Sequence, residues 1–500
     1  MNKKDLERLK FLEKEIRKIA EEEGLSTTEI NFEVVPTQRV IEGMAYNFPI
    51  NFSHWSHGRD YDRIRTIYEH TQQGIPYEQV WNFDTPRAFL VETNPFALQA
   101  VVIAHVYGHV DFFLNSRFTQ HGRKFSDIAE EARNAASRFR KYEERYGSEE
   151  VEAVMDAGYS IQWHQHPDVF YEEPDEEMLR SRLIERARAK LLAGQRPRNL
   201  AERPLTPDQI AGLERWIKTL STKTPPEPTF DLLGYTTKHS PLPLKPWMQD
   251  VLSVIRDQAR ALFPNTRTKM LNEGWATYWH VRIMRRLFEA GLLTPEEHGV
   301  FNTMHARVTA SSKKRFNWYR IGLALYEDVK ERWDKGRFGR EYERCRDQYQ
   351  KSHWDTSAGL GKQKIFEVRS LYSDGRAVAE LFNDDFIRSQ NLYIYGQVKN
   401  SNKIFDIITN NDAESVRQVL KRILGIHTPK ITIQDGNLNG SNALLLRHHY
   451  TGQELDLAYC EKTLENIQHL WGRTVYLETV ENKVPIVMQH DGQRFRKFQP

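Results

Sequence analysis

Two histidines in the stretch AHVYGHVDFF, His105 and His109, have the spacing of a pair of metal ligands. Four residues apart on a helix, their imidazole rings lie on one face, one turn from each other. This is the skeleton of the zinc motif H-E-x-x-H, but Val106 stands where that motif has its glutamate. A shared divalent ion would satisfy both rings, with nitrogens about 2.0 to 2.1 Å from zinc. The alternative is a pair of hydrogen-bonded core histidines.

A second stretch, TKMLNEGWATYWH, offers a third ligand in Glu273. On a helix, Glu273, Thr277 and His280 lie along one side. Glu273 and the two histidines would form a two-His, one-Glu set, which leaves one coordination position open for catalysis. His280 is an additional candidate for the site. The alternative is a structural pair of Glu273 and His280 beside buried tryptophans.

An enzyme that hydrolyses an amide at such a metal needs a general base, and Val106 cannot be one. Asp111 follows His109 by two residues, so it points about 200° around the helix and is better suited to orient the ligands from outside or to support the fold than to bind the metal. A base would therefore have to come from another segment, which the sequence does not identify.

Other histidines form weaker candidates for a site. His54 stands beside Trp55 in the polar segment NFSHWSHGRD, and we rank it first among them. His164 and His166 in QWHQHPD come second, because H-x-H is a frequent chance pair.

Composition predicts an ordinary globular protein. The 500 residues carry 71 Lys+Arg against 68 Asp+Glu, so the overall charge does not indicate a nucleic-acid partner. Two distant cysteines, Cys345 and Cys460, favour isolated thiols in a reducing cytoplasm. The charged N-terminus lacks the apolar core of a signal peptide, and the most apolar run contains both histidines and Asp111. We therefore expect a cytoplasmic protein without a membrane span.

The hydrophobic pattern predicts a mainly α fold. Helical periodicity dominates residues 1–395, which we interpret as one large α-rich domain interrupted at 172–230 by an exposed, charged and proline-bearing excursion. Residues 400–500 alternate short β-branched runs with two helical patterns in the order β-α-β-β-α-β. That order favours a small C-terminal α+β domain of two layers.

Two resemblances add to this interpretation, one of a short segment and one of most of the chain. The segment NEGWA resembles the helix from which thermolysin-like peptidases, the gluzincins, take their third zinc ligand, although Glu273 lies farther downstream than is usual there. The excursion at 172–230 accounts for part of that distance. The blocks HVYGHVDFF, NEGWATYWH, GLGKQKIFEVRSLYSD and EKTLENIQHLWGRTVYLET occur in this order, and the chain is similar to the stage V sporulation protein R (SpoVR) family from about Asn31 onward.

The family resemblance implies a cytoplasmic bacterial protein that supports formation of the spore cortex or, in bacteria without spores, a stationary-phase or stress response. It also implies two partners, a PrkA-type serine kinase and a YhbH-type protein. The segment FNWYRIGLALYEDV departs from the Ile-Asn-Pro-Tyr-like pattern of the family, which puts in doubt any role for Asn317 or Tyr319.

Two hypotheses of function follow. The first is a metal-dependent enzyme, with zinc as the expected metal, that acts on amide bonds through His105, His109 and Glu273. The second is a non-catalytic regulator or scaffold that works with the kinase and its companion. The basic run SSKKRFNWYR is short, and a solvated helix start explains it more simply than nucleic-acid binding does.

Overall fold

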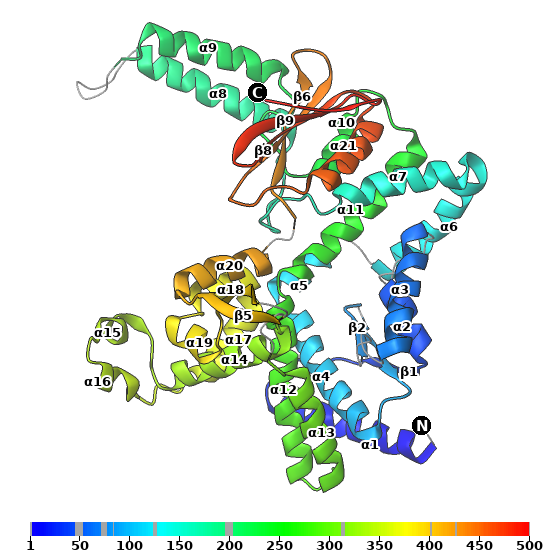
Figure 1. Ribbon diagram of the computed structural model, residues 1–500, viewed down its shortest axis with the longest axis vertical. Helices are drawn as coiled ribbons and strands as arrows, with labels where there is room; N and C mark the ends of the chain where they lie inside the picture. Colours follow the sequence, from blue (N-terminus) through cyan, green and yellow to red (C-terminus); the bar gives the residue numbers. More distant parts are fainter. Residues whose placement is uncertain are drawn as a thin grey trace. The chain divides into compact units, whose positions relative to one another are not determined.

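The computed structural model describes residues 3–45, 54–71, 78–83, 85–123, 128–195, 204–311, 316–400, 403–425 and 428–499. Helices dominate, and a five-stranded sheet lies near the C-terminus, which confirms the predicted helical class with a small C-terminal sheet (Figure 1). The chain forms two compact units. Unit 1 comprises residues 1–136 and 261–427, and unit 2 comprises residues 137–260 and 428–500.

The helices of unit 1 are α1 (Lys3–Glu22), α2 (Thr37–Ala45), α3 (Trp55–Thr71), α4 (Phe96–Asn115), α5 (Arg117–Gly122), α12 (Lys269–Glu289), α13 (Pro295–Val308), α14 (Trp318–Asp334), α15 (Gly339–Arg344), α16 (Gln348–Ser352), α17 (Gly361–Leu371), α18 (Asp374–Glu380), α19 (Asp384–Ser389) and α20 (Ala413–Gly425). Two further helices, α6 (Ile128–Tyr146) and α11 (Pro246–Thr266), contain the boundaries between the units.

Helix α4 is the central helix of unit 1. It begins after Pro95, and every residue from Ala97 to Phe113 is buried. By length and composition α4 is apolar enough to cross a membrane, but 94% of its most apolar stretch is buried inside the protein. It packs against α1, α12 and α13, which cover it on several sides (Figure 1). A helix that is apolar all round is typical of the core of a large protein.

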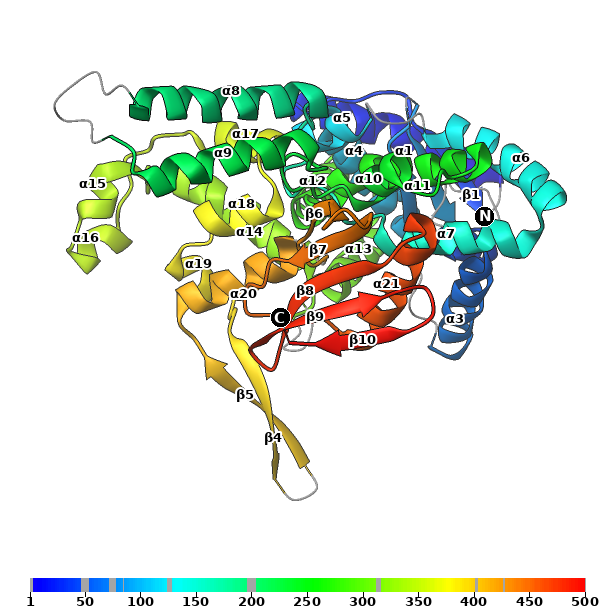
Figure 2. The same cartoon turned by 90° about the horizontal axis from the view of Figure 1, so that it is seen from above.

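Strands in unit 1 were largely absent from the sequence-based prediction. β1 (Asn31–Val35) pairs in parallel with β3 (Arg87–Val91), and β2 (Glu78–Trp81) pairs antiparallel to β3. These strands are short, and β1 meets a partner far along the chain, so local patterns give weak signals for them. β4 (Ile394–Asn400) and β5 (Lys403–Asn410) form a separate hairpin that extends away from α20 (Figure 2).

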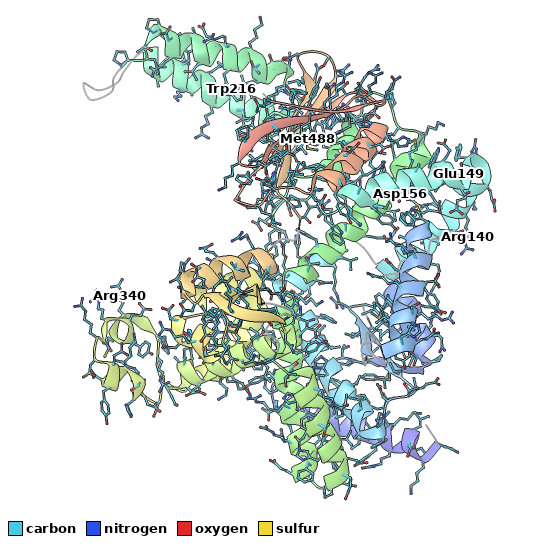
Figure 3. The ribbon with its side chains drawn as sticks, viewed as in Figure 1. Arg140, Glu149, Asp156, Trp216, Arg340 and Met488 are labelled. Atoms are coloured by element: carbon cyan, nitrogen blue, oxygen red, sulfur yellow. The ribbon has the colours of Figure 1, made fainter. Side chains whose placement is uncertain are left out.

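Unit 2 joins a helical part to the C-terminal sheet. Its sheet has the strand order β10-β9-β8-β7-β6, with β7 and β8 parallel and the other pairs antiparallel. Met488 on β9 is fully buried in this unit (Figure 3). The elements of unit 2 are α7 (Ser148–Ile161), α8 (Glu176–Gln195), α9 (Pro207–Thr222), α10 (Leu232–His239), α21 (Leu457–Trp471), β6 (Ile431–Leu438), β7 (Ala443–His448), β8 (Val475–Glu481), β9 (Val484–His490) and β10 (Phe495–Phe498).

The excursion at 172–230 contains α8 and α9, which lie side by side (Figures 1 and 2). Most of their described residues are exposed or half-buried, and Trp216 on α9 keeps 43% of its surface accessible (Figure 3). Residues 196–203 of the excursion lie outside the described residues. Near its end, Thr229 forms an antiparallel bridge with Ile433 of β6.

The predicted C-terminal elements form where expected, but their grouping differs. Among the described strands, β5 pairs with β4 rather than with the five-stranded sheet, and α20 packs against α18. Both elements therefore belong to unit 1, whereas the elements from β6 onward belong to unit 2. The division into compact units does not define independently folding domains. The predicted domain boundaries at residues 395 and 400 therefore stay predictions.

Candidate metal centre

Helices α4 and α12 cross at very short range. A Cβ atom added to Gly108, which lies between the two histidines on α4, would stand 2.6 Å from the Cα atom of Ala276 on α12. On the other side of α12, a Cβ atom on Gly274 would stand 2.4 Å from the backbone of Gly322 on α14. Glycine at 108, 274 and 322 therefore lets the backbones of α4, α12 and α14 approach this closely.

This crossing brings the three predicted ligands together. Oε2 of Glu273 lies 3.7 Å from Nε2 of His105 and 3.6 Å from Nε2 of His109, and ligand atoms of the three residues all lie within 4.8 Å of one another. The two oxygen–nitrogen distances exceed a hydrogen bond. They are close to the separation of about 3.3 Å between two ligands of a tetrahedral zinc ion. The three residues could therefore hold a metal ion.

Burial and charge at the cluster favour the protonation states that metal ligands need. Burial, and then His105, lowers the pKa of His109 to about 4, so its imidazole is neutral at neutral pH. Burial alone would raise the pKa of Glu273, but the interactions with His105 and His109 outweigh it and lower that pKa. Glu273 therefore favours its carboxylate form and His109 its neutral imidazole, which are the forms that bind a metal ion. The histidine side chains are 5 to 6% exposed, and Glu273 keeps 17% exposure.

Asp111 belongs to the structural support of the cluster. It is fully buried, and Arg369 Nη1 donates to both of its oxygens at 2.8 Å. The indole of Trp275, two residues after Glu273, donates to Asp111 Oδ2 at 2.7 Å. The backbone N–H of Ser26 donates to Oδ1 at 2.7 Å. Asp111 thus ties α4 to α12, α17 and the segment after α1.

Each histidine of the cluster has a partner behind its ring. Nδ1 of His105 lies 2.9 Å from Nδ1 of His280, and Nδ1 of His109 lies 3.0 Å from Oδ1 of Asn272. The predicted additional residue His280 therefore contacts His105 from behind and lies outside the three-residue set. Burial, followed by His105, lowers the pKa of His280 well below its ordinary value.

No replacement for the missing glutamate is evident among the described residues of the cluster, where Glu273 is the one carboxylate. Val106 is fully buried in the hydrophobic core. The ring of Tyr319 on α14 lies with its centroid 6.0 Å from that of His105. Asn317 caps α14, since its Oδ1 accepts the backbone N–H of Arg320 at 3.2 Å.

The other candidate histidines lie in different surroundings. His54 is buried beside α3, where its Nδ1 lies 2.7 Å from Oγ of Ser56. His164 lies in unit 2, where burial lowers its pKa to about 4. His166 stacks on Tyr171, with ring centroids 3.9 Å apart, at the wall of a cavity of about 770 Å³. The group of described residues that could hold a metal ion includes none of these three histidines.

The sequence-based prediction missed three residues that support the candidate metal centre. Asn272 had a visible signal, because it directly precedes Glu273, but its contact with His109 depends on the helix crossing. Gly108 could also be noticed in the sequence, because it lies between the two histidines. Asp374 gave no signal, yet its carboxylate accepts the backbone N–H groups of Met270 and Leu271 at 2.8 and 3.1 Å. It thereby caps the helix that carries Glu273 from a distant part of the chain.

Comparison with known proteins covers nearly the whole chain. The family described as SpoVR like protein matches residues 3–428, and the SpoVR-like C-terminal domain matches residues 429–482. The chain is also 26% identical over 488 residues to the uncharacterized protein YcgB of Escherichia coli strain K12, which covers 93% of this chain and 90% of that protein. No solved structure matches the chain. On these matches, the chain belongs to the SpoVR family.

Proposed function

We propose that this protein binds one divalent metal ion, with zinc the first candidate, through His105, His109 and Glu273. The convergence of Nε2, Nε2 and Oε2 from two crossing helices is the observation that carries the proposal. Three protein ligands leave one position of a tetrahedral ion open, as in catalytic rather than structural zinc sites. The gluzincin-like character of the two helices is part of the same proposal.

The proposed chemistry is action on amide bonds. A metal ion bound there would supply Lewis acidity toward a carbonyl oxygen. His105, His109 and Glu273 would hold it; the Glu273 side chain is 17% exposed, but its Oε2 atom is buried. A base for amide hydrolysis has to come from outside the described cluster, because Val106 is an apolar core residue. Binding and catalysis are therefore separate parts of the proposal and need separate tests.

Val106 also favours a second candidate function, a non-catalytic regulator. A hydrolase needs its general base at this position, but the residue there is a buried valine. A protein that binds the metal ion without hydrolysing amide bonds would not need that base. In either case we propose that the protein acts in the cytoplasm and supports spore cortex formation or a stationary-phase or stress response. The PrkA-type kinase and the YhbH-type protein stay predicted partners.

The test of metal binding is elemental analysis and zinc titration of the purified full-length protein. We expect about one ion per chain, and affinity at least about 100-fold lower in His105→Ala, His109→Ala and Glu273→Gln. Glu289→Gln is the matched control, since Glu289 is exposed at the end of the same helix. Wild-type affinity in all three ligand variants would refute the proposal.

The test that separates the two functions is complementation of a deletion strain. For an enzyme, Glu273→Gln and His105→Ala should fail to restore the cellular phenotype and should lose hydrolysis of amide substrates. A regulator that does not need the metal should restore the phenotype with Glu273→Gln while still engaging its partners.

A further inference from the structure

Three histidines from three helices form a continuous chain that starts at the candidate metal centre. Nδ1 of His105 on α4 lies 2.9 Å from Nδ1 of His280 on α12. Nε2 of His280 lies 3.2 Å from Nδ1 of His305 on α13. His105 and His280 are buried, and His305 is half-buried. The chain therefore runs from the buried cluster toward the surface of unit 1.

A metal ion on His105 would determine the tautomer of every ring in this chain. Nε2 of His105 faces Glu273, so a bound ion takes the lone pair of Nε2 and the ring proton stays on Nδ1. That N–H donates to Nδ1 of His280, which must then be the acceptor. His280 consequently carries its own proton on Nε2 and donates it to Nδ1 of His305. The donor and acceptor roles match at both contacts without any additional proton.

Packing around the three histidines keeps them in place. Phe301 on α13 is buried, with its ring centroid 6.1 Å from that of His280 and 5.9 Å from that of His305. α13 contacts both α4 and α12, so the helix that carries the last histidine is fixed to the two helices that carry the ligands. These contacts restrict rotation of the His280 ring, whose two nitrogens are both engaged in the chain.

We infer that His280, held in turn by His305, is a positioning residue that sets the tautomer and ring orientation of the metal ligand His105. This inference rests on the proposed function, because it concerns the same metal centre. Metal-bound histidines usually donate their second ring N–H to an acceptor, and loss of that acceptor typically lowers metal affinity 10- to 100-fold. Here the acceptor is a second imidazole rather than a carboxylate or a carbonyl oxygen.

The experiment compares two substitutions at the same position. His280→Leu removes both hydrogen-bonding groups, whereas His280→Gln keeps an acceptor for His105 and a donor for His305. In titrations of the full-length protein, we expect zinc affinity to fall about 10- to 100-fold in His280→Leu and to stay within about threefold of wild type in His280→Gln. His298→Leu is the control, because His298 is a histidine of α13 outside the chain that stacks on Phe288.

A spectroscopic measurement reports the tautomers directly. In the zinc-loaded protein with ¹⁵N-labelled histidine, His280 should carry its proton on Nε2, and His305→Leu should weaken zinc binding several-fold in the same direction. If His280→Leu does not fold, His305→Leu and His280→Gln still test the inference.

The outcomes separate this inference from the proposed function. Wild-type protein that binds no divalent ion would overturn both. Wild-type protein that binds zinc, while His280→Leu binds it equally tightly or His280 carries its proton on Nδ1, would overturn the inference and leave the metal site intact.

Discussion

The crossing of α4 and α12 makes a sharp prediction at Gly108. In Gly108→Ala, the new Cβ atom would lie 2.6 Å from the Cα atom of Ala276, whereas carbon atoms in contact are about 3.5 to 4.0 Å apart. The backbones must separate by about 1 Å. Overpacking of this kind costs about 1–3 kcal/mol, against a gain of about 1 kcal/mol from replacing glycine within a helix.

Gly299→Ala provides the matched control. Gly299 lies within α13 of the same unit, and an added Cβ atom there meets no atom within 4 Å. This variant should gain about 1 kcal/mol from helix propensity alone. The expected difference in stability between the two variants is therefore the overpacking cost, about 1–3 kcal/mol.

Thermal unfolding of the metal-free full-length variants measures this difference, and zinc titration adds a second readout. Separation of the helices lengthens the distances from Glu273 to His105 and His109, so zinc affinity should fall at least about tenfold in Gly108→Ala. Gly299→Ala should bind zinc as wild type does. Equal stability of the two variants would refute the close crossing of α4 and α12.

Three further predictions concern burial, pH and metal removal. Arg369→Met should destabilise unit 1 by about 3–5 kcal/mol because it leaves Asp111 charged and buried, and adding Asp111→Asn should recover part of that loss in unfolding experiments. His164 has a folded pKa of about 4 against an ordinary 6.5, so its contribution to stability is complete above pH 6.5 and declines as the pH falls toward 4. In His164→Gln, the melting temperature of unit 2 should depend less on pH over that range. An unchanged dependence on pH would contradict the burial of this ring. A chelator should lower the melting temperature of zinc-loaded wild type, where zinc at 1,000 times its Kd contributes about 4 kcal/mol, but should leave Glu273→Gln unchanged.

The sequence alone predicts features that depend on near neighbours. Helical periodicity places His105 and His109 on one face of a helix, and it directs Asp111 away from them into a structural contact. Short β-branched runs locate β6 to β9, and a helical pattern locates α21. These patterns are readable because an α-helix and a β-strand each impose a fixed repeat on the side chains that they bury.

Only the tertiary structure decides which distant segments meet. Glu273 joins the two histidines because glycine at position 108 lets α12 approach α4, and no local pattern encodes that crossing. The same holds for His305, which stands in a helix without a site-like motif, and for β5, which pairs with β4 instead of the C-terminal sheet. Such contacts depend on packing between elements far apart in the chain, where shape complementarity rather than residue spacing selects the partner.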